Sequence, residues 1–143
     1  MHMTTMDDKD LGALRNALTL AGLPVDDLTL PGRRFFSFNQ HGIEVAFGGI
    51  EGSGAERLLR SLVVLEAQRG RGTGAAVLDV LEAFAKSEGV GRLHLLTDSA
   101  VAFFTAHGYQ ARDRSLAPAS ISATAQFKTL CPASATYLSK SLV

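Results

Sequence analysis

A largely apolar segment that runs directly into a glycine-rich turn constrains this chain more than any other feature. Residues 58–65 have the hydrophobicity of a buried strand, and residues 69–74 contain three glycines and two arginines. Residues 75–85 then place apolar side chains at helical spacing. A turn that opens a helix leaves several backbone N–H groups without intrahelical partners, at the positive end of the helix dipole. The sequence therefore predicts an anion site, and pyrophosphate is a ligand that such turns bind.

Two other glycine patterns fit this turn less well. The loop that binds nucleoside triphosphates ends in Gly-Lys-Ser/Thr, and no lysine lies near the turn. The dinucleotide pattern Gly-x-Gly-x-x-Gly, if it starts at Gly72, has Val77 where the third glycine belongs. If it starts at Gly70, Ala75 holds that place, which is a tolerated variant. The strand that follows offers only Asp98 for a ribose, so this pattern remains the weaker alternative.

A third pattern fits best. Arg69-x-x-Gly72-x-Gly74 resembles the acetyl-CoA pyrophosphate motif of the GNAT N-acetyltransferases. Residues 100–109 are similar to the second signature of that family, a helix that ends at a glycine followed by an aromatic strand. The resemblance spans residues 11–142, and it implies that residues 1–143 form a single acyl-CoA N-acyltransferase domain.

The pattern of the whole chain predicts a helix, three antiparallel strands, a helix, a strand, a helix and two strands. Residues 116–132 are expected to be part helix and part loop. The fold class is therefore α+β, with a GNAT-like mixed central sheet of about six to seven strands flanked by helices. The expected helices are 11–21, 74–88 and 98–107, and the expected strands are 34–39, 43–50, 56–65, 92–97, 109–113 and 134–142.

Composition excludes several classes of protein. Basic and acidic residues both number 14, so the formal net charge is zero and no broad nucleic-acid surface is expected. No apolar run has the length of a membrane span, and the first residues lack the pattern of a secretory signal. Cys131 is the single cysteine, which precludes an intrachain disulfide and favours the cytoplasm. The histidines and the cysteine have no metal-site spacing, so no metal is expected.

The family resemblance implies acetyl-CoA as co-substrate and assigns residues to it. The turn would bind the pyrophosphate, and the backbone at the end of the long strand would bind the pantetheine arm and polarise the thioester carbonyl. Phe104 stands where many members have the tyrosine that protonates the thiolate, so solvent, Tyr109 or another residue would serve, and Phe104 would pack as a wall. The residues expected to bind the co-substrate are Leu62, Val63, Val64, Arg69, Gly70, Arg71, Gly72, Thr73, Gly74 and Phe104.

The general base is harder to assign. Several members of the family place a glutamate on the long strand, and that position falls near Leu58 here. Glu56 lies one alternation earlier and is the candidate base, although a solvated surface role is the simpler interpretation. Glu44 and Glu51 are close enough in the expected sheet to act through water. His94, among leucines, is better explained as a buried histidine with satisfied hydrogen bonds.

Arg60 interrupts the apolar strand, where a lone charge is costly without a partner. Alternation predicts that it shares a face with Leu62 and Val64, beside the thioester. Its guanidinium would then hold a substrate carboxylate through two hydrogen bonds, which makes it a candidate for substrate binding and catalysis. An internal ion pair with Glu44 or Glu56 is an equally good interpretation.

Four segments, residues 59–64, 95–97, 102–104 and 127–135, together resemble the arsenic-resistance branch of the family. That resemblance implies an acceptor amine on an amino-acid-like toxin, such as an organoarsenical or phosphinic glutamate analogue. Residues 120–127 would then roof the acceptor pocket, with Thr124 and Ser122 as polar contacts. Ser61 is a further candidate contact, or a packing residue on the other face of the strand.

The function expected from these features is acetyl transfer to the amine of a small amino acid or amino-acid-like toxin, by direct attack. A second hypothesis is a catalytically weak GNAT module that binds acyl-CoA as a sensor or partner domain. A third is a protein N-acetyltransferase. The expected partner is a small-molecule amine, with no nucleic acid and no membrane, and the resemblance also implies a homodimer.

Overall fold

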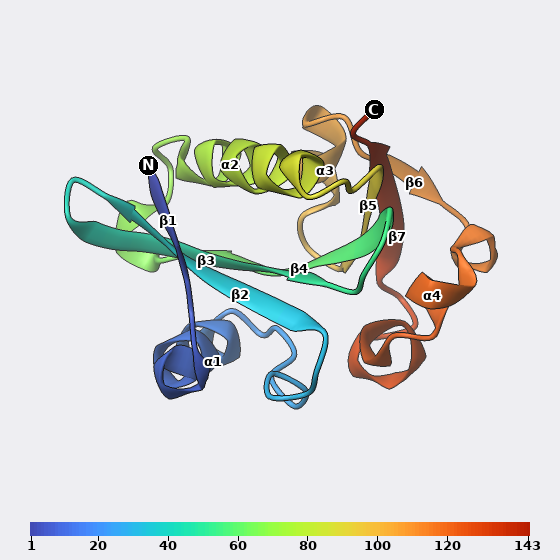
Figure 1. Ribbon diagram of the computed structural model, residues 1–143, viewed down its shortest axis with the longest axis horizontal. Helices are drawn as coiled ribbons and strands as arrows, with labels where there is room; N and C mark the ends of the chain where they lie inside the picture. The colour runs from blue at the N-terminus through green and yellow to red at the C-terminus, as the bar shows by residue number, and fades with distance from the viewer.

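A mixed sheet of seven strands runs through the protein, in the order β1-β2-β3-β4-β5-β7-β6 (Figure 1). The computed structural model describes residues 1–143. Neighbouring strands are antiparallel except β4 and β5, which are parallel. The strands are β1 (His2–Thr5), β2 (Arg33–Gln40), β3 (Ile43–Glu51), β4 (Glu56–Val64), β5 (Arg92–Thr97), β6 (Gln110–Arg112) and β7 (Thr136–Ser141).

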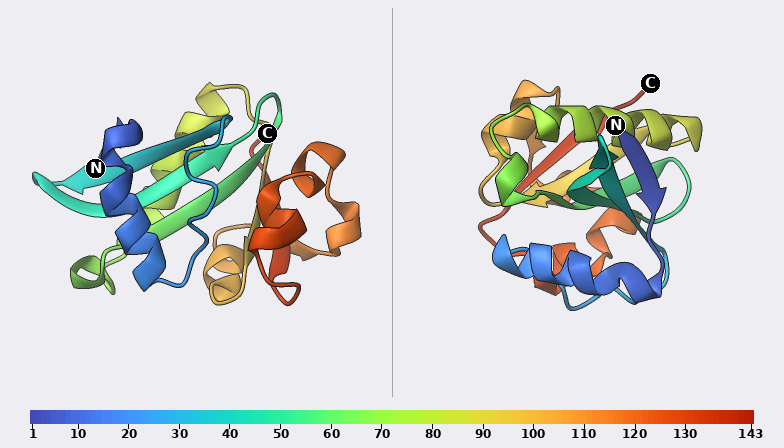
Figure 2. Two further views of the ribbon diagram at one scale, coloured as in Figure 1. Left: turned by 90° about the horizontal axis from the view of Figure 1, so that it is seen from below. Right: turned by 90° about the vertical axis from the view of Figure 1, so that its left-hand side faces the viewer.

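Helices cover both faces of this sheet. Figure 2 shows α2 on one face and α1 on the other, where the C-terminal helical segment also lies. The α-helices are α1 (Leu11–Leu20), α2 (Thr73–Ser87), α3 (Val101–Ala106) and α4 (Ala119–Ser122). Single 3₁₀ turns occupy Asp8–Asp10, Glu66–Gln68 and Arg114–Leu116, and Gln126–Leu130 forms a π-helical turn. This architecture confirms the α+β class and the mixed sheet.

The helical periodicity of the sequence accounts for two hydrophobic clusters. The larger one joins α2 and α3 to the sheet, and the fully buried Leu78 and Leu81 lie in it. A side chain at Gly48 would come within 2.8 Å of Leu81, so the glycine permits α2 to pack closely on β3. The smaller cluster places Leu14 and Leu18 of α1 on the opposite face.

The predicted elements agree with the structure within a few residues, and β5 has the predicted bounds. Three differences matter. The short strand β1 was not predicted, and β7 inserts between β5 and β6. Helix α3 is shorter than expected, because it begins only at Val101. Just before it, the Ala100 N–H donates to Thr97 Oγ1 at 3.0 Å.

Strands β4 and β5 separate soon after they meet. They pair only between Glu56 and Arg92, Arg57 and Leu93, and Leu58 and His94. Strand β4 continues to pair with β3 as far as Val64, but it has no partner on its other side beyond Leu58. The sheet therefore opens between the carboxyl ends of β4 and β5.

Candidate active-site cleft

The glycine-rich turn presents a row of unused backbone donors. Gly70 and Gly72 adopt positive φ values of 78° and 73°, and Thr73 begins α2. The Thr73 hydroxyl donates to the Gln68 carbonyl at 3.1 Å, which fixes the turn against the helix. None of the N–H groups of residues 70–75 donates a hydrogen bond within the protein. Gly70 and residues 72–75 line a pocket of about 510 Å³ beside Phe103 and His107, which suits an anion, whereas Arg71 does not line it.

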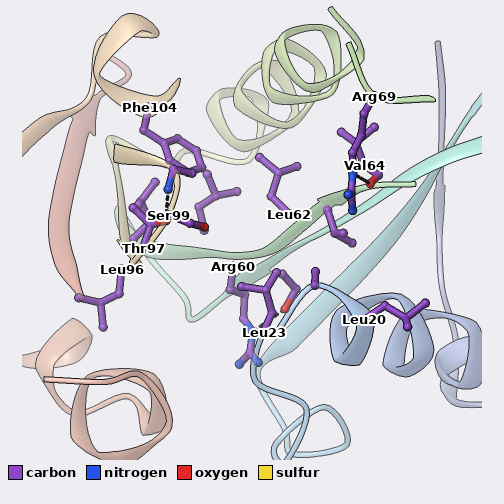
Figure 3. Close-up of a pocket in the computed structure, with 16 residues that line it drawn as sticks. Leu20, Leu23, Arg60, Leu62, Val64, Arg69, Leu96, Thr97, Ser99 and Phe104 are labelled. Carbon is purple, nitrogen blue, oxygen red and sulfur yellow. Dashed lines mark hydrogen bonds between the residues drawn. The ribbon is translucent and has the colours of Figure 1, made fainter. Parts of the chain in front are cut away.

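A second pocket, of about 480 Å³, continues this one into the opening of the sheet (Figure 3). Its walls come from the end of α1, the outer half of β4, the end of β5 and the start of α3. Leu62, Val64, Arg69, Ala100 and Phe104 line both pockets. The two pockets therefore form one cleft, which runs from the turn to the gap between β4 and β5.

The edge of β4 that faces this gap carries free backbone N–H groups. The Leu65 N–H donates to the Val45 carbonyl at 2.9 Å. Because the hydrogen bonds of an antiparallel pair alternate, Val63 also directs its backbone toward β3, whereas Leu62 and Val64 direct theirs toward the gap. Arg69 Nε donates to the Val64 carbonyl at 3.0 Å, which ties the turn to the strand.

Of the three β4 residues expected to meet the pantetheine arm, Leu62 and Val64 thus have the required orientation. Val63 does not, because its backbone pairs with Phe47 and its side chain lies in the cluster under α1. Val63 nevertheless lines the part of the cleft at the β4–β5 opening, so its contact with the co-substrate stays a prediction. Phe104 is buried and lines both pockets, in agreement with a packing role.

Arg60 is fully engaged by the protein. Its Nη1 atom lies 2.6 Å from Asp27 Oδ2 and 2.7 Å from Glu51 Oε1, and its Nη2 atom lies 2.6 Å from Asp27 Oδ1. Its Nε atom donates to Ser61 Oγ at 3.2 Å. The side chain has no solvent exposure. Arg33 completes the cluster by contacting both carboxylates, so two arginines balance two acids.

The expected roles of Arg60 in substrate binding and catalysis therefore need correction. Its partners are Asp27 and Glu51, not Glu44 or Glu56, and its donors already meet carboxylates. An incoming substrate carboxylate would have to displace one of them from a buried site, which is costly.

The protonation behaviour of this cluster follows from the same contacts. Burial alone would raise the pKa of Asp27, but hydrogen bonds and charge from Arg60 and Arg33 outweigh it and lower that pKa. Burial alone would lower the pKa of Arg60, but the two carboxylates raise it. Both groups are therefore held in their charged forms.

A bulge in β4 explains why alternation failed for Arg60. Ser61 adopts a positive φ of 58°, and the register between β3 and β4 shifts between Phe47 and Gly49. As a result, Leu62 packs on the α2 side of the sheet, whereas the Arg60 guanidinium lies over the Phe35 ring on the α1 side. Ser61 lines the cleft, but its hydroxyl already accepts from Arg60.

Glu56 lies outside the cleft. Its Oε2 atom is 2.9 Å from His94 Nε2, in a different pocket. The other ring nitrogen of His94 is 2.7 Å from the Tyr137 oxygen, so His94 is buried and satisfied. This placement gives no support to Glu56 as the base for acetyl transfer.

Two further expected residues also point elsewhere. The Thr124 hydroxyl donates to the Ile121 carbonyl at 2.7 Å, and Thr124 does not line the cleft. The Tyr109 hydroxyl donates to Glu82 Oε2 at 2.9 Å inside the larger cluster. Burial, followed by the Glu82 charge, raises the pKa of Tyr109, so this phenol does not replace the missing acid at Phe104.

Sequence reasoning missed several residues that shape the cleft. Leu20, the last residue of α1, and Leu23, just after the helix, line the pocket at the β4–β5 opening, and His107 lines the anion pocket. No short motif marks them, because only the tertiary fold brings them beside β4.

No helix combines the length and apolar character that crossing a membrane requires.

Comparisons with known proteins agree with this geometry. The family described as acetyltransferase (GNAT) domain matches residues 31–111. N-alpha-acetyltransferase 80 of Mus musculus is 43% identical over 53 residues, which are 37% of this chain and 17% of that protein. The chain thus spans less than a fifth of that curated relative.

Two solved structures show the same fold. A GNAT acetyltransferase from Staphylococcus aureus has a TM-score of 0.76 at 16% identity, with 99% of both chains covered. N-acetylglutamate synthase from Neisseria gonorrhoeae, complexed with coenzyme A and N-acetyl-glutamate, has a TM-score of 0.74 at 14% identity. That match covers all of this chain and 36% of the synthase. The GNAT fold expected from the sequence is confirmed.

Proposed function

Because this chain belongs to the GNAT acetyltransferase family, we propose that it transfers acetyl from acetyl-CoA to the amine of a small amino acid or amino-acid-like compound. The observation that carries the proposal is the single cleft that joins the free N–H groups of the turn to the open edge of β4. A neighbour of the same fold binds coenzyme A and N-acetyl-glutamate, which supports the choice of both substrates.

The residues of the cleft fit acetyl-CoA. The N–H groups of residues 70–75 suit the pyrophosphate, aided by the positive end of α2. Leu62 and Val64 offer strand-like hydrogen bonds to the pantetheine amides. Bound there, acetyl-CoA supplies an activated thioester for direct attack by the acceptor amine. A backbone N–H on the free edge of β4 stabilises the negative charge that develops on the carbonyl oxygen.

Proton transfer around the β4–β5 opening of the cleft relies on water. The residues around the β4–β5 opening include no carboxylate and no histidine, and their only ionisable side chains are Arg60 and Arg69. The protein therefore contributes mainly by positioning the amine and by polarising the carbonyl. An acceptor whose amine is already neutral at the assay pH is expected to react faster than a more basic one.

The direct test is release of free thiol from acetyl-CoA in the presence of a panel of amino acids. The panel should include glutamate-like arsenical and phosphinic compounds, which test the narrower resemblance to the arsenic-resistance branch. Turnover with at least one small amine is the expected result. Failure to bind CoA, measured by calorimetry, would contradict the proposal.

A catalytically weak module that senses acyl-CoA is the second candidate function. Phe104 favours it, because a phenylalanine supplies no proton to the departing thiolate. CoA binding without turnover on any amine would identify such a module. Turnover only on peptide N-termini would instead identify a protein N-acetyltransferase, the activity in the name of the mouse relative.

We also propose that residues 1–143 act as one acyl-CoA N-acyltransferase domain in the cytoplasm, and that two copies form a homodimer. Light scattering at micromolar concentration tests the dimer, since a monomeric mass would contradict it. Cell fractionation tests the compartment.

A further inference from the structure

A third pocket, of about 320 Å³, lies outside the cleft and shares no lining residue with it. Its lining comes from β4, β5, β7 and β6, which are neighbours in the sheet, and from Leu116 and Pro118 in the segment that leads into α4. Its lining is mostly polar, whereas apolar side chains predominate in the acceptor part of the cleft. A polar cavity built from four strands is a candidate binding site in its own right.

A chain of hydrogen bonds fixes the floor of this pocket. His94 lies between Glu56 Oε2, at 2.9 Å, and the Tyr137 oxygen, at 2.7 Å. With Glu56 ionised, Nε2–H of His94 donates to the carboxylate and Nδ1 accepts from the phenol. Glu56 is therefore oriented by His94, and its second oxygen, Oε1, accepts no hydrogen bond from the protein.

Two arginines of the same pocket are left without acidic partners. Arg92 is the register neighbour of Glu56, yet it forms no ion pair with it and donates only a long 3.4 Å bond to Ser139. Arg112 binds only the neutral side chain of Gln110, at 3.2 Å. Unpaired guanidinium groups in a small cavity are well suited to carboxylates, which they hold through two parallel hydrogen bonds.

We propose that this pocket binds an acidic amino acid, held as a ligand and not as the acetyl acceptor. Two arginines and one glutamate give the lining a net formal charge of +1 when His94 is neutral. A molecule with two carboxylates and one ammonium group carries the opposite charge and matches all three side chains. The pocket volume of about 320 Å³ is about that of ten water molecules, which is enough for glutamate together with some bound water.

This arrangement keeps the ligand apart from acetyl transfer. Its ammonium group lies at Glu56 Oε1, which faces the third pocket and not the β4–β5 opening. The inference is therefore independent of the proposed function, because the pocket can be occupied whether or not the cleft turns over acetyl-CoA.

The test is a titration of ¹³C-histidine-labelled protein with L-glutamate, followed through the ring resonances of His94. Glutarate, which has both carboxylates but no amine, is the matched ligand. We expect saturable shifts with L-glutamate at millimolar concentration, and binding of glutarate at least tenfold weaker. Adding CoA at saturating concentration is expected to leave the affinity for L-glutamate unchanged.

Three variants make the result specific. Arg112→Gln should weaken L-glutamate binding at least tenfold, because it removes a charge-assisted contact from an exposed side chain. Glu56→Gln should abolish the preference for L-glutamate over glutarate. Arg57→Gln is the control, since Arg57 precedes Leu58 on β4, faces the other side of the sheet from Glu56, and should change the affinity less than twofold.

Several outcomes would overturn the proposal. These are the absence of saturable shifts at His94, equal binding by wild type and Arg112→Gln, equal binding of the two ligands, or displacement of L-glutamate by CoA. None of them depends on turnover, so a failure here and a failure of the proposed acetyl transfer are separate results.

Discussion

The glycine-rich turn follows the carboxyl end of β4, and the cluster around Arg60 lies at the middle of that strand. The two regions treat polar groups in opposite ways. In the turn, the N–H groups of residues 70–75 have no acceptor in the protein. In the cluster, every charged side chain has a partner, and the Arg60 side chain has no contact with solvent. Unused donors that line a pocket indicate a binding site, whereas a charge that is fully paired indicates structure.

The two regions also differ in what carries the interaction. The turn acts through backbone groups, whose orientation follows from glycine positions and from the start of a helix. The cluster acts through side chains from distant segments, since Asp27 and Arg60 are 33 residues apart. A functional role is therefore readable from local sequence in the first region and not in the second.

The largest effect is expected for Arg60→Ala, which tests whether the cluster has a structural role. Arg60→Ala leaves two buried carboxylates with one arginine, so we expect about 3–5 kcal/mol less stability in urea unfolding. Arg34→Ala is the control, because its ion pair with Glu88 is partly exposed. Together with its contacts to the Phe36 and Phe84 rings, its loss should cost about 1–2 kcal/mol. Unchanged stability with a raised KM for the acceptor would instead support Arg60 as the residue that binds a substrate carboxylate.

The pH dependence of stability tests the role of Asp27 in this cluster. Its lowered pKa means that the ionised form stabilises the fold above about pH 4, and that this contribution is lost as pH falls through the folded-state pKa. Asp27→Asn lacks the contribution at every pH. The stability gap between wild type and variant should therefore be largest near pH 7 and shrink below pH 4. Urea unfolding at pH 7, 5 and 3 measures it, and a gap that widened toward pH 3 would contradict the assignment.

The binding role of the turn has its own matched pair of variants. Gly72→Val and Gly89→Val both force a branched residue into positive φ, and each should cost about 1–2 kcal/mol of stability. Only Gly72 lines the anion pocket, so only Gly72→Val should also weaken CoA binding, by about tenfold or more. Calorimetry with CoA tests this. Equal affinity losses in both variants would mean that the turn acts through stability alone.

Phe104 forms part of the wall that both pockets share, and its replacement tests proton donation in the cleft. Phe104→Tyr would restore a phenol where many family members carry one. We expect kcat to rise about tenfold near neutral pH, because proton donation to the leaving thiolate is then assisted. Steady-state kinetics with a neutral-side-chain amino acid as acceptor would show it. An unchanged kcat would mean that thiolate protonation does not limit the rate.

The smallest effect is expected at Thr124. Its hydroxyl is occupied by the Ile121 carbonyl, so Thr124→Ala should lower stability by about 0.5–1.5 kcal/mol and leave the KM for the acceptor within about twofold. A larger rise in KM without loss of stability would indicate that Thr124 contacts the acceptor.

The sequence predicted the parts of the fold that depend on local pattern. The helices follow from apolar periodicity, and Gly89, with its positive φ, follows the end of α2. The order of the first long strands follows from their hairpin turns. The short polar strand β1 has no such pattern, because it forms only by pairing with β2. The insertion of β7 between β5 and β6 is a long-range property of the topology.

The predictions for the site also differ between features that follow from local sequence and features that depend on long-range structure. The turn and the end of β4 were predicted as the co-substrate site from features of the backbone, and that role stays a prediction. The error in the expected face of Arg60 comes from the bulge at Ser61. A positive φ at a serine leaves no mark in the sequence, unlike the same angle at a glycine.

The brief meeting of β4 and β5 divides the sheet into two blocks, β1–β4 and β5–β7, joined along a seam of three residue pairs. A flexible molecule seated beyond that seam, with hydrogen bonds to Leu62 and Val64, would bridge both blocks as a substitute strand. Melting temperature would then rise with its concentration through mass action. In a cell depleted of coenzyme A, the boundary between these two blocks would be the least stable part of the sheet.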